Sequence, residues 1–298
     1  MKNNKFIGTG VALITPFDEL NNVDYNSLNK LIENSIRNGV NYFVVLGTTA
    51  ESTSLSIKEQ NDIINFVIKI VNKRVPIVLG LGGNNTSKIL ERINEINFDE
   101  IAAILSVSPY YNKPTQEGIY KHYSKIAERS PVDIILYNVP GRTSSNIEPL
   151  TVKKLAEKYA NIIGIKEASG DLCQSMQIKE YLPNDFLIIS GDDKMTFPII
   201  MLGGHGVISV QAMAFPEIFS LMVKHSLNKN IIEARKLHYK LLYSVDMFYI
   251  EGNPTGIKQG LFFLDIIKTN KLRLPLVEMS SKNSQILNKL IKKTLIDS

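Results

Sequence analysis

The chain is short of residue types that would define several other classes of protein. Among its 298 residues it has no tryptophan and a single cysteine, Cys173. One cysteine excludes an internal disulfide framework and a cluster of thiolate metal ligands, and it favours a reducing compartment. Asp171 and Gln174 indicate the capping box of a helix around Cys173, so we expect this cysteine to pack rather than to act as a nucleophile.

Long apolar runs and concentrated charge are also lacking. No stretch reaches the roughly 18 apolar residues of a membrane span, and the start of the chain has no signal-peptide core. The net charge is +5, but the lysines are spread along the chain, and no basic block with interleaved aromatic residues occurs. We therefore expect a cytoplasmic protein that binds neither a membrane nor a nucleic acid.

What the sequence does contain is a series of eight short apolar runs separated by segments of helix length. They cover residues 10–14, 42–46, 77–80, 102–107, 133–138, 162–166, 187–190 and 206–210. Connections of this length imply parallel pairing of the strands. Neither a Gly-x-Gly-x-x-Gly motif after the first strand nor a Walker loop occurs, which argues against a dinucleotide or ATP fold. The pattern predicts an α/β protein with a (β/α)8 TIM barrel.

Helical patterns continue after the eighth strand, over residues 218–227, 231–249 and 286–295. A bare barrel does not need these helices, and no Pro/Gly/Ser-rich linker would free them as an independent module. We therefore expect a catalytic barrel over residues 1–225 and a C-terminal helical extension over residues 226–298 packed on the barrel.

In such a barrel the reactive groups lie at the C-terminal ends of the strands. Lys166 closes the apolar run 161–165, where a buried strand turns into a loop. An ammonium group is costly to desolvate, so a lysine in this position tends to lose its proton and become a nucleophile toward a carbonyl carbon. The alternative is a strand-end lysine that extends its ammonium group to solvent.

Three other strand ends carry polar or aromatic groups. The turn 47–52 contains Thr48 and Thr49, whose hydroxyls and backbone N–H groups could cradle a carboxylate or could be ordinary caps. At the fifth strand, Tyr137 could relay a proton and Arg142 could bind a carboxylate with both of its nitrogens. The alternatives for these two are a packed phenol and a surface guanidinium. The fourth strand ends in two adjacent tyrosines between prolines, within residues 108–114.

Together these segments resemble the pyruvate-dependent class I aldolase superfamily and, within it, the dihydrodipicolinate synthase (4-hydroxy-tetrahydrodipicolinate synthase) family. The resemblance covers essentially the whole chain, through the motifs VALITPF, GTTAES, SPYYNKP, YNVPGRT, GIKEASGD and GGHGVIS. It implies a cytoplasmic lyase that condenses pyruvate with L-aspartate 4-semialdehyde to give 4-hydroxy-tetrahydrodipicolinate, the first committed step of diaminopimelate and lysine biosynthesis. It also implies a homotetramer built as a dimer of dimers.

The resemblance further implies a role for each site residue. Lys166 would form a covalent imine with pyruvate, so that no metal or other cofactor is needed. Thr48 and Thr49 would hold the carboxylate of pyruvate, and Tyr137 would be the general acid and base at the imine carbon. Thr48 would relay protons between Tyr137 and Tyr111, which would reach in from a neighbouring subunit.

Two further positions match the family and one departs from it. Arg142 would hold the carboxylate of the semialdehyde at the mouth of the site, and the backbone carbonyl of Ile208 would line the pocket. Ala50 stands where the family commonly has glycine. If that position needs a positive φ, we expect the Thr-Thr turn to shift slightly.

The resemblance also bears on regulation by lysine. Ile57 and Gln60 stand where lysine-inhibited members have histidine, and Lys88 stands where an acidic residue would meet the ammonium group of the ligand. Two cations repel, and isoleucine accepts no hydrogen bond. We therefore expect weak or absent feedback inhibition.

Other functions fit the same residues less well. An N-acetylneuraminate lyase or 2-keto-3-deoxy sugar-acid aldolase would keep the lysine and the tyrosine, but Arg142 and the Thr-Thr turn favour the synthase. A non-catalytic barrel that senses a carboxylate would have lost Lys166 or Tyr137. A zinc-dependent class II aldolase is disfavoured because the four histidines are scattered, and we expect His205 to be structural.

Overall fold

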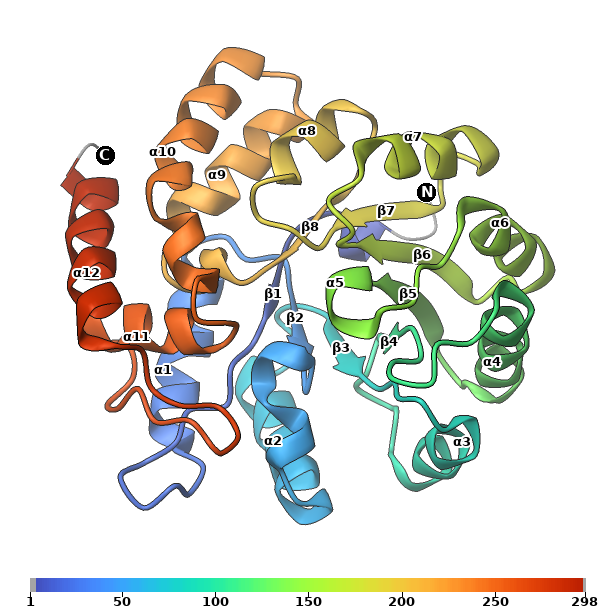
Figure 1. Cartoon of the computed structure of the whole chain (residues 1–298), viewed down its shortest axis with the longest axis horizontal. Coiled ribbons are helices and arrows are strands. Elements are labelled where there is room, and N and C mark those ends of the chain that lie inside the picture. Colours follow the sequence, from blue (N-terminus) through green and yellow to red (C-terminus); the bar gives the residue numbers. More distant parts are fainter. Residues whose placement is uncertain (1–3, 297–298) are drawn as a thin grey trace.

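The computed structural model describes residues 4–296, and in this range eight parallel strands form a closed barrel in the order β1 to β8 (Figure 1). The predicted (β/α)8 TIM barrel is confirmed. The strands are β1 (Gly8–Ala12), β2 (Tyr42–Val45), β3 (Ile77–Gly80), β4 (Ala103–Val107), β5 (Asp133–Asn138), β6 (Ile162–Glu167), β7 (Leu187–Ser190) and β8 (Gly206–Ser209).

Helices surround the barrel and continue beyond it. They are α1 (Tyr25–Arg37), α2 (Ile57–Val71), α3 (Thr86–Glu95), α4 (Gln116–Arg129), α5 (Pro140–Thr143), α6 (Pro149–Lys158), α7 (Leu172–Tyr181), α8 (Thr196–Met201), α9 (Pro216–Leu227), α10 (Ile231–Tyr249), α11 (Thr255–Phe263) and α12 (Ser281–Ile296). Short 3-10 turns lie at Asn4–Phe6 (η1), Thr48–Ala50 (η2), Ser52–Ser54 (η3) and Gln211–Met213 (η4).

Local sequence signals place the helices that follow the first two strands. Asp24 caps α1 by accepting hydrogen bonds from two backbone N–H groups of its first turn. Ser56 and Glu59 form a reciprocal capping box at the start of α2. Both helices then bury one apolar face against the barrel, as the 3.6-residue period of their sequences requires.

Packing of the barrel interior beside β1 depends on a glycine. The ring of Tyr42 fills the barrel interior next to Gly10, where an added Cβ would lie 2.3 Å from that ring. The Tyr42 hydroxyl donates a hydrogen bond of 3.2 Å to the carbonyl of Val207 on β8. A large side chain on β2 therefore needs a residue without a side chain on β1.

The C-terminal helices α10, α11 and α12 lie on one side of the barrel, next to α9 and α1 (Figure 1). Residues 231–249 and 286–295 are helical as predicted, whereas α11 was not anticipated from the sequence. Helix α11 is buried over most of its length, so its sequence shows no amphipathic period. The proposed division at residue 225 falls in the last turn of α9 and stays a prediction.

Two single-residue expectations can be compared with the structure. His205 is structural as expected, because Nδ1 accepts a hydrogen bond from the Ile188 amide and Nε2 lies 3.2 Å from the Asn184 carbonyl oxygen. The expectation that Cys173 packs was wrong, because this residue is exposed in the first turn of α7. Asp171 caps that turn, while Gln174 turns inward to Glu167 instead of completing the capping box.

Among residues 4–296, no helix combines the length and the apolar character needed to cross a membrane.

Candidate active site

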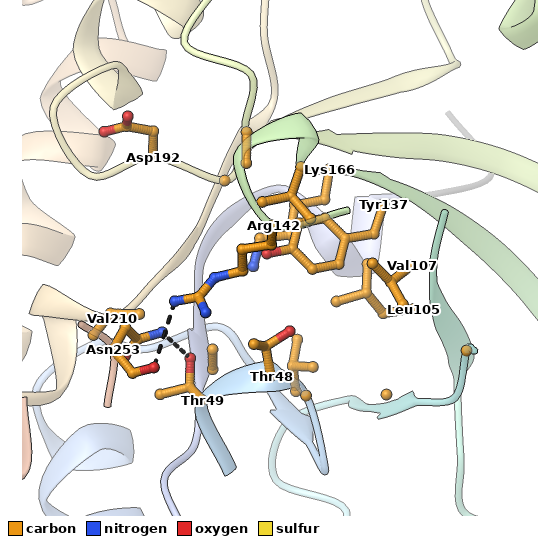
Figure 2. Close-up of a pocket in the computed structure, with 18 of the residues that line it drawn as sticks. Thr48, Thr49, Leu105, Val107, Tyr137, Arg142, Lys166, Asp192, Val210 and Asn253 are labelled. Carbon is orange, nitrogen blue, oxygen red and sulfur yellow. Dashed lines mark hydrogen bonds between the residues drawn. The ribbon is translucent and has the colours of Figure 1, made fainter. Parts of the chain in front are cut away.

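A cavity of about 540 Å³ opens at the C-terminal ends of the strands, and residues from several of these ends line it (Figure 2). Its lining includes Thr48, Thr49, Tyr137, Arg142 and Lys166. The sequence predicted these five as site residues from three separate segments, and barrel closure brings them together.

Lys166 lies on β6 between Tyr137 of β5 and Ile189 of β7, and only 6% of its surface is exposed. Its side chain runs against Gly191, where an added Cβ would come within 3.0 Å of the lysine Cε. The lysine therefore does not extend to solvent, which was the alternative open from the sequence.

Burial lowers the pKa of Lys166 to about 8, because the charged form loses its hydration. The negative charge of Asp193 raises this pKa, and the positive charge of Arg142 lowers it further. About a tenth of this side chain is therefore a neutral amine at pH 7, far more than for an ordinary lysine, and the neutral amine is the nucleophilic form.

Tyr137 stands beside this amine. The Lys166 Nζ atom lies 4.4 Å from the centroid of the tyrosine ring, and Figure 2 shows the two side chains next to each other with Thr48 opposite. Burial raises the pKa of Tyr137, while the positive charge of Arg142 and a side-chain hydrogen bond with Thr48 lower it. The phenol is therefore protonated at neutral pH.

The turn after β2 is a single 3-10 turn, η2, followed by a left-handed residue, Glu51, with φ of 54°. The Thr49 hydroxyl accepts a hydrogen bond of 2.9 Å from the side chain of Asn253. The Ala50 carbonyl accepts one of 2.7 Å from the Thr15 hydroxyl. Ala50 itself is not left-handed, so the replacement of glycine by alanine strains no backbone here.

Arg142 extends from α5 across the cavity toward Asn253 (Figure 2). Its Nη2 atom donates a long hydrogen bond of 3.4 Å to the Asn253 carbonyl, and the side chain is otherwise exposed. Asn253 precedes α11, so the C-terminal extension supplies part of the site. No sequence pattern marked Asn253, because its partners lie more than one hundred positions away.

A second group that the sequence did not indicate is Asp193, in the loop after β7. Its Oδ2 atom accepts hydrogen bonds from the Gln211 amide at 2.9 Å, the Val210 amide at 3.3 Å and the Tyr249 hydroxyl at 2.8 Å. Burial raises the pKa of this carboxyl group. The double aspartate after β7 was the available signal, because such residues at a strand end face the cavity side of a barrel.

The end of β6 is held by a buried polar network. The carboxylate of Glu167 accepts hydrogen bonds from Asn138 at 3.0 Å, Gln174 at 2.8 Å and the Ser169 amide at 2.7 Å. Because Glu167 directly follows Lys166, these bonds fix the backbone from which the lysine side chain extends.

Tyr111 and Ile208 are not part of the cavity lining. Tyr111 is 88% exposed and left-handed, with φ of 73°, and its neighbour Tyr110 lines the cavity instead. Ile208 is buried in the barrel interior, and Val210 lines the cavity two residues further on. The roles assigned to Tyr111 and Ile208 stay predictions.

Comparisons with known proteins agree with this geometry. The sequence matches the Dihydrodipicolinate synthetase family over residues 5–294. It is 51% identical over 285 residues to the 4-hydroxy-tetrahydrodipicolinate synthase of Flavobacterium psychrophilum, a match that covers 96% of each chain. The structure is similar to that of dihydrodipicolinate synthase from Aquifex aeolicus, with a TM-score of 0.93, 37% identity and coverage of 97% of this chain and 98% of that one. It is also similar to the enzyme from Cyanidioschyzon merolae with lysine bound, with a TM-score of 0.93, 32% identity and coverage of 98% and 99%.

The pKa of Lys166 can be measured without any substrate. Competitive acetylation at a series of pH values, read by mass spectrometry, should give Lys166 half of its limiting reactivity near pH 8, since only the neutral amine reacts. Lys58 is the internal control, because its hydrogen bond to Asp62 raises its pKa. If Lys166 and Lys58 titrate together, the burial argument fails.

Proposed function

The chain belongs to the dihydrodipicolinate synthetase family, and from this premise we propose how its cavity condenses pyruvate with L-aspartate 4-semialdehyde. It is a lyase, a 4-hydroxy-tetrahydrodipicolinate synthase, of the diaminopimelate and lysine pathway. The relatives support this function and not that of a sugar-acid aldolase. The observation that supports the mechanism most directly is a buried lysine amine with a pKa of about 8 beside a turn rich in N–H and hydroxyl groups.

The first stage joins pyruvate to Lys166. The neutral amine attacks the ketone carbon, the oxygen of that ketone leaves as water, and an imine remains. Tyr137 donates the proton that the departing oxygen needs, since its raised pKa keeps the phenol protonated. The carboxylate of pyruvate lies on Thr48 and Thr49 at the end of β2.

The second stage forms the new carbon–carbon bond. Removal of a proton from the methyl group of the imine, with Tyr137 as the base, gives an enamine. The enamine carbon attacks the aldehyde of the semialdehyde, and the aldehyde oxygen takes from Tyr137 the proton that Tyr137 removed from the methyl group, so that a hydroxyl group forms. Arg142 holds the carboxylate of the semialdehyde at the mouth of the cavity. The guanidinium suits this task because, among residues 4–296, it makes one long hydrogen bond and is otherwise exposed.

The last stage releases the enzyme. The amino group of the bound semialdehyde attacks the imine carbon, closes the ring and displaces the Lys166 amine. The imine itself accepts the electron pair during the reaction, so we propose that no metal or other cofactor takes part. The Ile208 carbonyl is proposed to line the pocket next to the bound substrate. We place the enzyme in the cytoplasm, where a single free cysteine is stable.

We further propose a homotetramer, a dimer of dimers, in which Tyr111 completes the site of the neighbouring subunit. The tyrosine is 88% exposed and stands outside the cavity of its own chain. A large exposed aromatic residue held in a left-handed conformation is unusual, and burial against a partner would account for it. Thr48, which contacts Tyr137, would then connect the two tyrosines in a proton relay.

The covalent step is tested by trapping. Incubation with pyruvate followed by borohydride should attach the three-carbon acid to Lys166, and intact-mass and peptide mass spectrometry would locate it. The coupled assay with pyruvate and the semialdehyde runs in parallel, and Lys166→Ala should lose at least about 1,000-fold in turnover. Labelling that persists in Lys166→Ala would contradict the mechanism.

The shared site is tested by complementation. Tyr111→Phe and Lys166→Ala are each expected to be nearly inactive, but a mixed oligomer contains one site with both native residues. Equal mixing should restore about a quarter of the wild-type activity, since half of the dimers are mixed and each has one working site of two. No recovery in oligomers verified by native mass spectrometry would mean that each chain builds its site alone.

Weak inhibition by lysine is the expected regulatory property. The Gln60 amide already donates to the carbonyls of Ser52 at 3.1 Å and Leu55 at 3.2 Å, and Ile57 is half exposed without a polar group. Lys88 adds a cation where the ligand would bring its own. At 1 mM lysine we expect less than about 20% loss of turnover, a limit that corresponds to weak binding. Sub-millimolar inhibition that Lys88→Ala alters would overturn this expectation.

A further inference from the structure

An ion pair lies buried behind the Thr48–Thr49 turn. The Nζ atom of Lys258 and the Oε1 atom of Glu51 are 2.5 Å apart, and the two side chains are 0% and 1% exposed. Glu51 belongs to the turn after β2, whereas Lys258 lies on α11 of the C-terminal extension. The pair therefore joins the proposed pyruvate cradle to the part of the chain that a bare barrel would lack.

Further contacts enclose both charges. The Lys258 ammonium donates to the Lys271 carbonyl at 2.9 Å and lies 4.0 Å from the centroid of the Phe17 ring. The other oxygen of Glu51 accepts from the Arg273 amide at 3.0 Å. Burial lowers the pKa of Lys258 to about 8, and the charge of Glu51 acts in the opposite direction.

Arg273 forms a second layer around the same turn. Its guanidinium pairs with both oxygens of Glu59, at 2.6 and 3.0 Å, donates to the Ser54 carbonyl at 3.0 Å and stacks 4.5 Å from the Phe17 ring. Its charge is thus matched by Glu59. Lys258 is left as the direct partner of the Glu51 carboxylate.

Stability alone is a poor reason for this arrangement. A buried ion pair can often be replaced by apolar residues without loss, because desolvation offsets the attraction. Glu51 is moreover left-handed, a conformation that disfavours any residue other than glycine, asparagine or aspartate. A functional reason lies two residues away, where the carboxylate of pyruvate is proposed to bind at Thr48 and Thr49.

Without Lys258, the buried carboxylate of Glu51 would lie unpaired next to the Thr48–Thr49 turn. It would repel an anionic substrate, because the protein interior screens charge poorly. We propose that Lys258 is a positioning residue for pyruvate: it holds and neutralises Glu51, so that the turn after β2 can accept a carboxylate. This inference rests on the proposed function of the cavity. The hydrogen bond that the Asn253 side chain donates to the Thr49 hydroxyl connects the turn after β2 to the C-terminal extension at a second point.

Variants that leave an anion, a cation or no charge at the Glu51–Lys258 pair separate this role from a purely structural one. Lys258→Met leaves Glu51 unpaired, so the KM for pyruvate should rise at least about tenfold, while kcat falls less than about threefold. In the double variant Glu51→Gln/Lys258→Met no charge is stranded, and the KM should return to within about threefold of wild type. Glu51→Gln alone leaves a cation behind the cradle, so its KM should not rise.

The measurement is borohydride trapping on Lys166 as a function of pyruvate concentration, alongside steady-state kinetics and thermal unfolding. Lys58→Met is the matched control, because Lys58 and Asp62 also lie 2.6 Å apart, on α2 directly after the turn, but are exposed. This control should keep the wild-type KM.

Each outcome decides the question. Equal rises of KM in Lys258→Met and the double variant, or no rise in Lys258→Met, would overturn the inference. If Lys258→Met does not fold, the double variant and Glu51→Gln decide, and a tenfold rise of KM in either would reject it. Failure of the proposed function is a separate result, because wild type would then form no pyruvate adduct at all.

Discussion

The desolvation of one ammonium group governs how the open end of this barrel is organised. Lys166 is enclosed because β6 lies between β5 and β7 in a closed sheet, and because Gly191 leaves room for its side chain. The same enclosure lowers its pKa to about 8 and thereby makes the amine reactive. If the sheet were open at this point, the Lys166 ammonium group would be hydrated, and its pKa would return toward that of an ordinary lysine.

Burial is the main cause of the lowered pKa of Lys166, and the charged groups around it change this pKa by smaller amounts. Asp193 partly compensates the ammonium charge, and Arg142 opposes it while also keeping the pKa of Tyr137 from rising further. Arg142 therefore lowers the pKa of both acid–base groups, whereas Asp193 raises that of Lys166. Glu167, buried and hydrogen-bonded to Asn138, Gln174 and the Ser169 amide, holds the strand end.

The parts of the fold and site that could be predicted are those set by local sequence. The strands follow from short apolar runs, and residues such as Lys166 and Thr48 follow from their place at strand ends. Asn253 could not be predicted in this way, because its partners lie far away in sequence, and α11 shows no amphipathic period because it is buried. Asp193 was missed although the double aspartate after β7 was a signal at a strand end. The sequence could not show whether Ala50 needs a positive φ. In the structure the left-handed residue of this turn is the next one, Glu51.

The hydrogen bond between Asn253 and Thr49 spans 204 positions of the chain, and the ion pair of Glu51 with Lys258 closes a loop of similar span. A ribosome that has made all eight strands has therefore not yet made the residues that hold the cradle. During synthesis the barrel can close around Lys166 before its carboxylate subsite is finished. The Lys166 nucleophile is thus synthesised before the residues that hold the Thr48–Thr49 turn.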